Sequence, residues 1–336
     1  MSDARKIAEV LHRADIGAIE SIRERTDHPG STCRLHDVVA GDRKLIAKVA
    51  DQETLHERAT RELHVLHAIG HRLAGLAPRL IAGESEDRPG RCIIIVEAVE
   101  GPTGDSLRGG DRQEIESVLD RMSMAWRIKA DDPDLAPLDL PDWGRGTDGD
   151  RPHRRRAERF KRRGRVMGER FPDCETLHGP LRNEIGERFE VIAQAPGERP
   201  ARLIHGDLHL DNVVFTPDGP RILDWQTASI GDPVDDVVRL AMESQPEQSI
   251  DSILELCDRH PETRTSPERL ARNVILTYAG LVSGLTGRPD LEPGSREHRF
   301  ARRMLSPGWT ATPTRQALDI LARTEPRDQS STTDIP

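Results

Sequence analysis

The pattern of apolar and polar positions divides the chain into two parts of different character. In the first hundred residues, turn-forming runs separate short β-prone stretches, which span residues 18–25, 32–40 and 44–49. Residues 52–73 contain no proline, and their apolar side chains return at helical spacing. The apolar run 91–97 predicts a buried strand. We therefore expect this part to form a small sheet around one main helix.

After a break rich in Gly and Pro at residues 101–105, the spacing becomes helical. Helices are predicted around residues 115–126, 181–192, 234–243, 269–285 and 314–323. Residues 131–150 are rich in Pro, Gly and Asp, which predicts a long loop. The chain should therefore be α+β, with an N-terminal lobe at 1–100, a mainly helical lobe at 101–325 and a disordered tail at 326–336.

Composition excludes several classes of protein. The 336 residues carry 49 Lys and Arg against 58 Asp and Glu, a net charge of -9, so the chain is not a general polyanion binder. Aromatic residues make up 3%, so the core must be aliphatic. No apolar run approaches the roughly 18 residues of a membrane span, and the charged N-terminus does not resemble a signal peptide. We expect a cytoplasmic protein whose four separated cysteines are reduced.

Three polar residues between positions 203 and 225 are the main candidates for catalytic residues. Asp207, Asn212 and Asp224 follow short apolar stretches; Asn212 lies five positions after Asp207, and Asp224 lies twelve positions after Asn212. Phosphoryl transfer needs hard oxygen ligands for Mg²⁺ and one carboxylate that accepts the proton of the attacking hydroxyl. These residues supply both. The alternative, an ordinary polar turn, leaves their joint spacing unexplained.

The order of three motifs gives this region a family resemblance. His-Gly-Asp-Leu-His at 205–209, Leu-Asp-Trp at 223–225 and Gly-Asp-Pro-Val-Asp-Asp at 231–236 together cover about thirty residues. The region resembles the aminoglycoside phosphotransferase and choline kinase superfamily, the small-molecule branch of the protein-kinase-like fold. This resemblance implies a two-lobed fold with a five-stranded antiparallel sheet in a nucleotide-binding N-terminal lobe and a larger helical lobe that binds the substrate.

The resemblance also implies ATP and Mg²⁺ as cofactors and a role for each matching residue. Asp207 corresponds to the catalytic base, and Asn212 and Asp224 correspond to the magnesium ligands. His205 corresponds to the residue that braces the catalytic loop, and Asp236 to the carboxylate that accepts backbone N–H bonds from it.

A lysine and a glutamate far apart in the sequence are predicted to pair. Lys48 ends an apolar strand, and Glu62 falls inside the apolar stripe of the helix that follows, whereas Glu57 falls on the solvent side. Burial of an unpaired carboxylate is costly, so we expect Glu62 to form an ion pair with Lys48. The resemblance implies that Lys48 binds the nucleotide phosphates. The alternative is two unrelated surface charges.

The rest of the nucleotide site leaves a weaker sequence signal. No Gly-x-Gly-x-x-Gly pattern precedes Lys48, and the nearest phosphate-facing loop contains Gly30 and Ser31, for which a plain turn is an equal alternative. The resemblance places adenine against backbone groups from Glu97 to Val99.

Local charge bears on the phosphate acceptor. Residues 231–260 contain eight Asp or Glu against two arginines, which favours a cationic acceptor. Residues 151–170 are strongly basic but hold only one aromatic residue, so we expect a solvated helix, and a nucleic-acid partner for this run is the alternative. His64, His67 and His71 fall opposite the apolar stripe, which predicts a solvated face and no metal site.

We therefore expect an ATP- and Mg²⁺-dependent kinase that phosphorylates a hydroxyl of a small molecule. An aminoglycoside-like antibiotic is one acceptor, and antibiotic resistance would be the corresponding role. A choline-like or amino-alcohol metabolite and a neutral sugar stay open, as does a nucleotide-binding pseudokinase that serves as a partner module. The sequence does not choose among these acceptors, nor does it give the oligomeric state.

Overall fold

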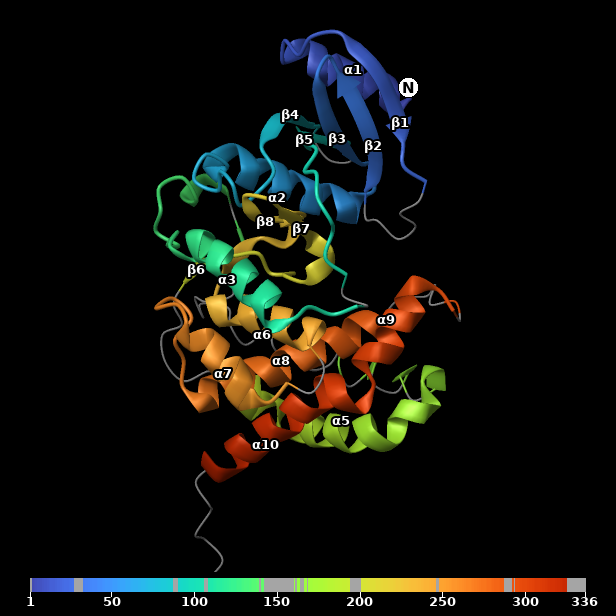
Figure 1. Ribbon diagram of the computed structural model, residues 1–336. Helices are drawn as coiled ribbons and strands as arrows, with labels where there is room; N and C mark the ends of the chain where they lie inside the picture. Colours follow the sequence, from blue (N-terminus) through green and yellow to red (C-terminus); the bar gives the residue numbers. More distant parts are fainter. Residues whose placement is uncertain are drawn as a thin grey trace, which may run out of the picture. The chain divides into compact units, whose positions relative to one another are not determined.

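The computed structural model divides the chain into two compact units (Figure 1). It describes residues 2–26, 33–86, 90–105, 108–138, 140–141, 160, 162–163, 166–167, 169–193, 201–245, 248–286, 292 and 294–324. The first unit comprises residues 1–106, 110–144 and 199–236, and the second comprises 107–109, 145–198 and 237–336. The α+β class predicted from the sequence is confirmed. The lobe limits at residues 100 and 325 stay predictions, and the tail and most of the basic run lie outside the described residues.

A five-stranded sheet forms one end of the first unit. Its strands are β1 (Ile19–Glu24), β2 (Arg34–Ala40), β3 (Arg43–Ala50), β4 (Leu80–Ser85) and β5 (Cys92–Glu97). They pair antiparallel in the order β1-β2-β3-β5-β4, which puts β3 and β5 in the interior of the sheet. Interior strands are apolar on both faces, and this explains the continuous apolar run that predicted β5.

The sheet lies between two helices, α1 (Asp3–Arg13) and α2 (Glu53–Ile69). Ile7, Val10 and Leu11 of α1 are buried in a cluster with side chains from one face of β2, β3 and β5. The side chain of Lys48 lies on the other face and reaches α2. The predicted helix corresponds to α2. Helix α1 was not predicted, although Ala4, Ile7, Ala8 and Leu11 recur at helical spacing.

Two short two-stranded sheets and helix α3 also belong to the first unit. Helix α3 (Arg112–Trp126) begins at a capping box formed by Asp111 and Glu114. Strand β6 (Arg202–Ile204) pairs with β9 (Ser229–Gly231), and β7 (Val213–Thr216) pairs with β8 (Gly219–Ile222). Short 3-10 turns, η1 (Ala136–Leu138), η2 (Leu210–Asn212) and η3 (Trp225–Thr227), connect other elements of this unit.

The predicted break at residues 101–105 runs beside β7. The Gly104 N–H donates to the Val213 carbonyl at 2.8 Å, and the Phe215 N–H donates to the Pro102 carbonyl at 2.9 Å. A Cβ on Gly104 would lie 2.4 Å from the Leu210 carbonyl oxygen, so only glycine allows this approach. The break is therefore anchored on the segment that carries Asn212.

Helices dominate the described part of the second unit. They are α5 (Pro172–Ala193), α7 (Ile250–Asp258), α8 (Pro267–Thr286), α9 (Arg296–Met304) and α10 (Thr312–Thr324), with a π-helical turn, η4, at Pro307–Ala311. Helix α6 (Pro233–Ser244) begins in the first unit and continues into the second. Helices α7 and α9 were not predicted. No described helix is long and apolar enough to cross a membrane.

In the core of the second unit, the side chain of His178 binds one side-chain hydroxyl and one backbone carbonyl. Both ring nitrogens of the fully buried His178 make hydrogen bonds of 2.8 Å, one with the Tyr278 hydroxyl and one with the Leu305 carbonyl. A carbonyl only accepts, so Nε2 of His178 carries the proton and Nδ1 accepts from the Tyr278 hydroxyl. Burial lowers the pKa of His178 because the charged ring would lose its hydration.

The packing of α1 can be tested by stability. Leu11→Ala should reduce the free energy of unfolding by about 2–5 kcal/mol, because Leu11 is fully buried between α1 and the sheet. Arg5→Ala on the exposed side of the same helix should cost less than about 0.5 kcal/mol. Urea denaturation measures both. Equal losses for the two variants would contradict this account of α1.

The buried histidine predicts a pH dependence of stability. The folded-state pKa of His178 lies below the unfolded value of about 6.5. The unfolded chain therefore binds the proton first, and stability falls as the pH decreases below about 6.5, by at most about 1.4 kcal/mol per pH unit. His178→Gln should remove this part of the slope in urea titrations between pH 5 and 8, whereas His64→Gln on the exposed face of α2 should not. Identical slopes for wild type and His178→Gln would contradict the assignment.

Candidate active site

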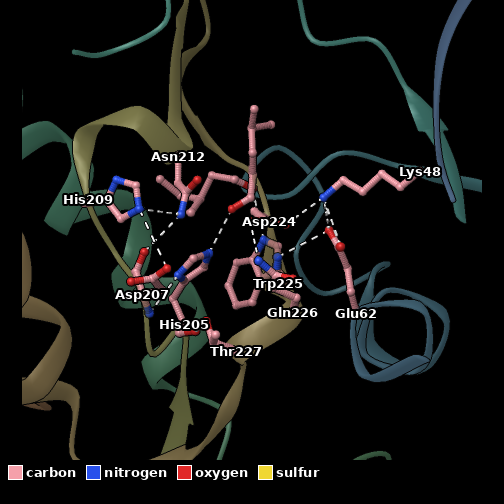
Figure 2. A network of polar contacts seen from close by, with 12 residues as sticks. Lys48, Glu62, His205, Asp207, His209, Asn212, Asp224, Trp225, Gln226 and Thr227 are labelled. Atoms are coloured by element: carbon pink, nitrogen blue, oxygen red, sulfur yellow. Dashed lines mark hydrogen bonds and ion pairs between the residues drawn. The ribbon is translucent and has the colours of Figure 1, made fainter. Parts of the chain in front are cut away.

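Lys48 lies between two carboxylates from separate parts of the first unit. Its Nζ lies 2.8 and 2.9 Å from the two carboxylate oxygens of Glu62 and 2.9 Å from Oδ1 of Asp224 (Figure 2). Glu62 is 3% exposed, so the structure places it on the buried face of α2 as its helical position predicted. The Trp225 N–H donates to the same carboxylate at 3.3 Å. These contacts join β3, α2 and the segment that follows β8.

Electrostatics keep Lys48 charged in this environment. Burial alone would lower the pKa of Lys48, but the carboxylates of Asp224 and Glu62 outweigh it, and the net shift is upward. Burial raises the pKa of Glu62, and the Lys48 ammonium and the Trp225 N–H oppose that rise. The ammonium is therefore present at neutral pH and is fixed in position.

The loop between β6 and η2 is held by the backbone and ring of His205. Nε2 of His205 donates to the Leu223 carbonyl at 2.8 Å, and Nδ1 accepts from the Asp207 N–H at 3.3 Å. The ring also meets Trp225 edge to face, with centroids 5.0 Å apart. One buried side chain thus connects the loop of Asp207 to the strand end before Asp224.

Asp207, Asn212 and His209 lie together on this loop (Figure 2). Nδ2 of Asn212 donates to the Asp207 carbonyl at 3.1 Å and lies 3.1 Å from Nε2 of His209. The same ring nitrogen lies 3.8 Å from Oδ2 of Asp207. The Asp207 side chain is 31% exposed, which leaves its carboxylate accessible to a reactant.

Asp224 adopts a backbone conformation that non-glycine residues rarely use. Its φ of 64° and ψ of 59° lie in the left-handed region, at a cost of about 1–3 kcal/mol that the surrounding contacts must offset. Oδ1 faces Lys48, and Oδ2 accepts from Nε2 of Gln226 at 2.8 Å. Strain of this kind is typical of residues placed for function.

Asp236 supports the loop with a fully buried carboxylate. Oδ2 accepts the His205 N–H at 2.9 Å and the Trp126 indole N–H at 3.1 Å, and Oδ1 accepts the Gly206 N–H at 2.9 Å. Gly206 has a φ of 78°, and a Cβ there would lie 2.5 Å from the Thr227 carbonyl oxygen. Burial raises the pKa of Asp236, and these donors oppose the rise.

Of the residues predicted for adenine binding, Glu97 ends β5 and Val99 lies two residues further along the chain. Arg221 pairs with the Glu97 carboxylate, and the Glu97 N–H donates to the Arg79 carbonyl at 3.0 Å. Val99 follows in the partly buried segment after β5. Gly30 and Ser31 lie outside the described residues.

Sequence reasoning did not assign roles to three residues of the network, His209, Gln226 and Trp126. His209 and Gln226 stand three and two residues from Asn212 and Asp224, so proximity to those positions was an available signal. Trp126 contacts Asp236 across 110 positions of sequence, and nothing local indicates that contact.

The role of Asp236 in the loop can be tested by an isosteric change. Asp236→Asn should reduce the free energy of unfolding by about 1–3 kcal/mol, because the new amide places N–H groups against N–H donors in a buried site. Asp42→Asn in the exposed turn after β2 is the control and should be neutral. Chemical denaturation with tryptophan fluorescence measures both, and a wild-type value for Asp236→Asn would contradict the bracing role.

Three comparisons place this geometry among known proteins. Residues 32–270 match the Phosphotransferase enzyme family, APH. No curated protein matches the chain. A choline kinase from Streptococcus pneumoniae has a TM-score of 0.56 at 17% identity, covering 90% of this chain and 98% of its own.

Two further solved structures share the fold. A spectinomycin phosphotransferase, in complex with ADP and spectinomycin, has a TM-score of 0.63 at 10% identity, covering 94% of this chain and 98% of its own. An aminoglycoside 2'-phosphotransferase, in complex with GDP, has a TM-score of 0.59 at 14% identity, covering 90% and 99%. These similarities confirm the two-lobed kinase-like fold. The family match spans well over half of the 336 residues, so the chain belongs to the phosphotransferase enzyme family and is a small-molecule phosphotransferase.

Proposed function

We propose that this protein transfers the γ-phosphoryl group of ATP to a hydroxyl of a small molecule, with Mg²⁺ as cofactor. The observation that carries the proposal is the position of the Lys48 ammonium, held between the carboxylates of Glu62 and Asp224. A fixed cation at the end of a buried strand suits nucleotide phosphates, because it supplies charge without reorganisation during the reaction.

Asp207 is proposed as the base. The acceptor hydroxyl would attack the γ-phosphorus, a new oxygen–phosphorus bond would form, and the bond to the bridging oxygen of ADP would break. The hydroxyl proton would pass to the Asp207 carboxylate. The partial exposure of this side chain and the bracing of its loop by His205 and Asp236 support the role, since a base must be accessible and held in place.

Asn212 and Asp224 are proposed to hold magnesium. Their amide and carboxylate oxygens are the hard donors that Mg²⁺ prefers, and Mg²⁺ in kinases takes few protein ligands together with phosphate oxygens. Among the described residues, no group of three or more His, Cys, Asp or Glu is placed to hold a metal ion by itself. When bound, the ion would neutralise charge that develops on the phosphates.

The base of the nucleotide is proposed to bind to the segment after β5. The N–H groups of Glu97 and Ala98 already donate to the Arg79 and Lys44 carbonyls. The carbonyl of Glu97 and the N–H of Val99 are therefore the groups that we propose for adenine. The spectinomycin phosphotransferase of similar fold is in complex with ADP, which supports a nucleotide ligand for this chain.

For the acceptor, we propose a small molecule that carries amino groups as well as a hydroxyl. The similar structures include enzymes for aminoglycosides, spectinomycin and choline, which supports this class. The acidic stretch 231–260 gives weaker support for a cationic acceptor than its charge suggested, because three carboxylates of the stretch are buried in the structure. These are Asp232, Asp236 and Glu243.

Replacement of the proposed catalytic base, Asp207, separates its role in phosphoryl transfer from nucleotide binding. Asp207→Asn should lower the rate of phosphoryl transfer by about 10²- to 10⁴-fold, because the amide cannot accept the hydroxyl proton. ADP should bind to the variant as it does to the wild type. ADP release across a panel of aminoglycosides, amino alcohols and neutral sugars measures turnover, and calorimetry measures ADP binding.

Asp218→Asn, in the exposed turn between β7 and β8, is the control and should keep wild-type turnover. Turnover by Asp207→Asn at the wild-type rate would overturn the assignment of the base. A wild type that binds ADP but transfers phosphate to no member of the panel would instead favour the pseudokinase alternative.

A further inference from the structure

The nitrogen of the Asn212 side-chain amide has two polar neighbours. Nδ2 donates to the Asp207 carbonyl at 3.1 Å and lies 3.1 Å from Nε2 of His209 (Figure 2). The carbonyl oxygen can only accept, so the nitrogen end of the amide must face it. The oxygen end, Oδ1, is consequently directed away from both groups.

This orientation matters because an amide is nearly symmetric in shape but not in chemistry. If the group rotated by half a turn, Oδ1 would face the Asp207 carbonyl, and the two oxygens would repel each other. The Asp207 carbonyl is enough to disfavour the flipped orientation. A single hydrogen bond, however, still lets the amide plane rotate about that bond. A second acceptor at a different angle removes this freedom, and His209 supplies it.

His209 is well placed to act as a fixed acceptor. It precedes η2, and the Asn212 backbone N–H donates to its carbonyl at 3.0 Å, so backbone and side chain bind the same residue. Its side chain is 18% exposed. Nδ1 lies 4.0 Å from Oδ2 of Asp211. With a proton on Nδ1, Nε2 is the acceptor that the Asn212 amide requires.

We propose that His209 is a positioning residue for the metal site: its Nε2 orients the Asn212 amide so that Oδ1 is presented to the magnesium ion. The inference rests on the proposed function, in which Asn212 is a metal ligand. It adds a residue that touches neither the ion nor the phosphates. Residues that orient metal ligands in this way change metal affinity by about 10- to 100-fold when they are replaced.

The test uses the full-length protein and ADP, with no acceptor. Calorimetry gives ADP affinity without metal and at rising Mg²⁺ concentrations. His209→Leu should raise the Mg²⁺ concentration for half-maximal enhancement of ADP binding by about tenfold or more, and should leave metal-free ADP binding unchanged. His209→Gln should stay within about threefold of the wild type, because its Oε1 can occupy the position of Nε2.

Two further variants keep the test decisive. His36→Leu removes another buried histidine of the first unit, one that lies on the α1 face of the sheet beside Asp3, and its Mg²⁺ dependence should match the wild type. If His209→Leu does not fold, His209→Asn replaces it, since its shorter amide stays polar but does not reach the Nε2 position.

The outcomes separate this inference from the proposed function. Equal Mg²⁺ dependence of the wild type and His209→Leu overturns the role of His209 alone, as does an equal shift for His209→Leu and His209→Gln. An ADP affinity that does not respond to Mg²⁺ in the wild type itself overturns the proposed metal site, and the role of His209 with it.

Discussion

The site depends on one buried charge, the ammonium of Lys48. A cation removed from water is costly unless opposite charges replace its hydration, and here Glu62 and Asp224 do so from two other segments. The three segments must approach one another for the cation to be tolerated. The pairing therefore links the sheet, α2 and the strand end after β8, and it fixes the position of the ammonium.

A second constraint acts on the loop that carries Asp207. Buried backbone N–H groups need acceptors, and those that find none within a tight loop must find them elsewhere. Asp236 accepts two of them and the Trp126 indole as well, while His205 connects the loop to the Leu223 carbonyl. The loop is thus held by polar contacts on its inner side, and the carboxylate of Asp207 remains partly exposed.

The structure divides the acidic residues behind the net charge of -9 into two kinds. Part of the acidic excess after the loop is structural, because Asp236 accepts the loop N–H groups and Asp232 accepts the Val234 N–H at 3.1 Å. Another part lies on the exposed side of α7, at Asp251, Glu255 and Asp258. A count of charges along the sequence cannot separate carboxylates that support the fold from carboxylates that face solvent.

The sequence by itself determined the elements whose signals are local. Helical spacing placed Glu62 on the buried face of α2, and the spacing of Asp207, Asn212 and Asp224 indicated phosphoryl transfer before any contact was known. Only the tertiary structure decided which partners meet. It placed α1 on one face of the sheet, and it brought Trp126 to Asp236 and Lys48 to Asp224. Such contacts depend on where separate elements pack, and residue spacing along one element carries no information about that.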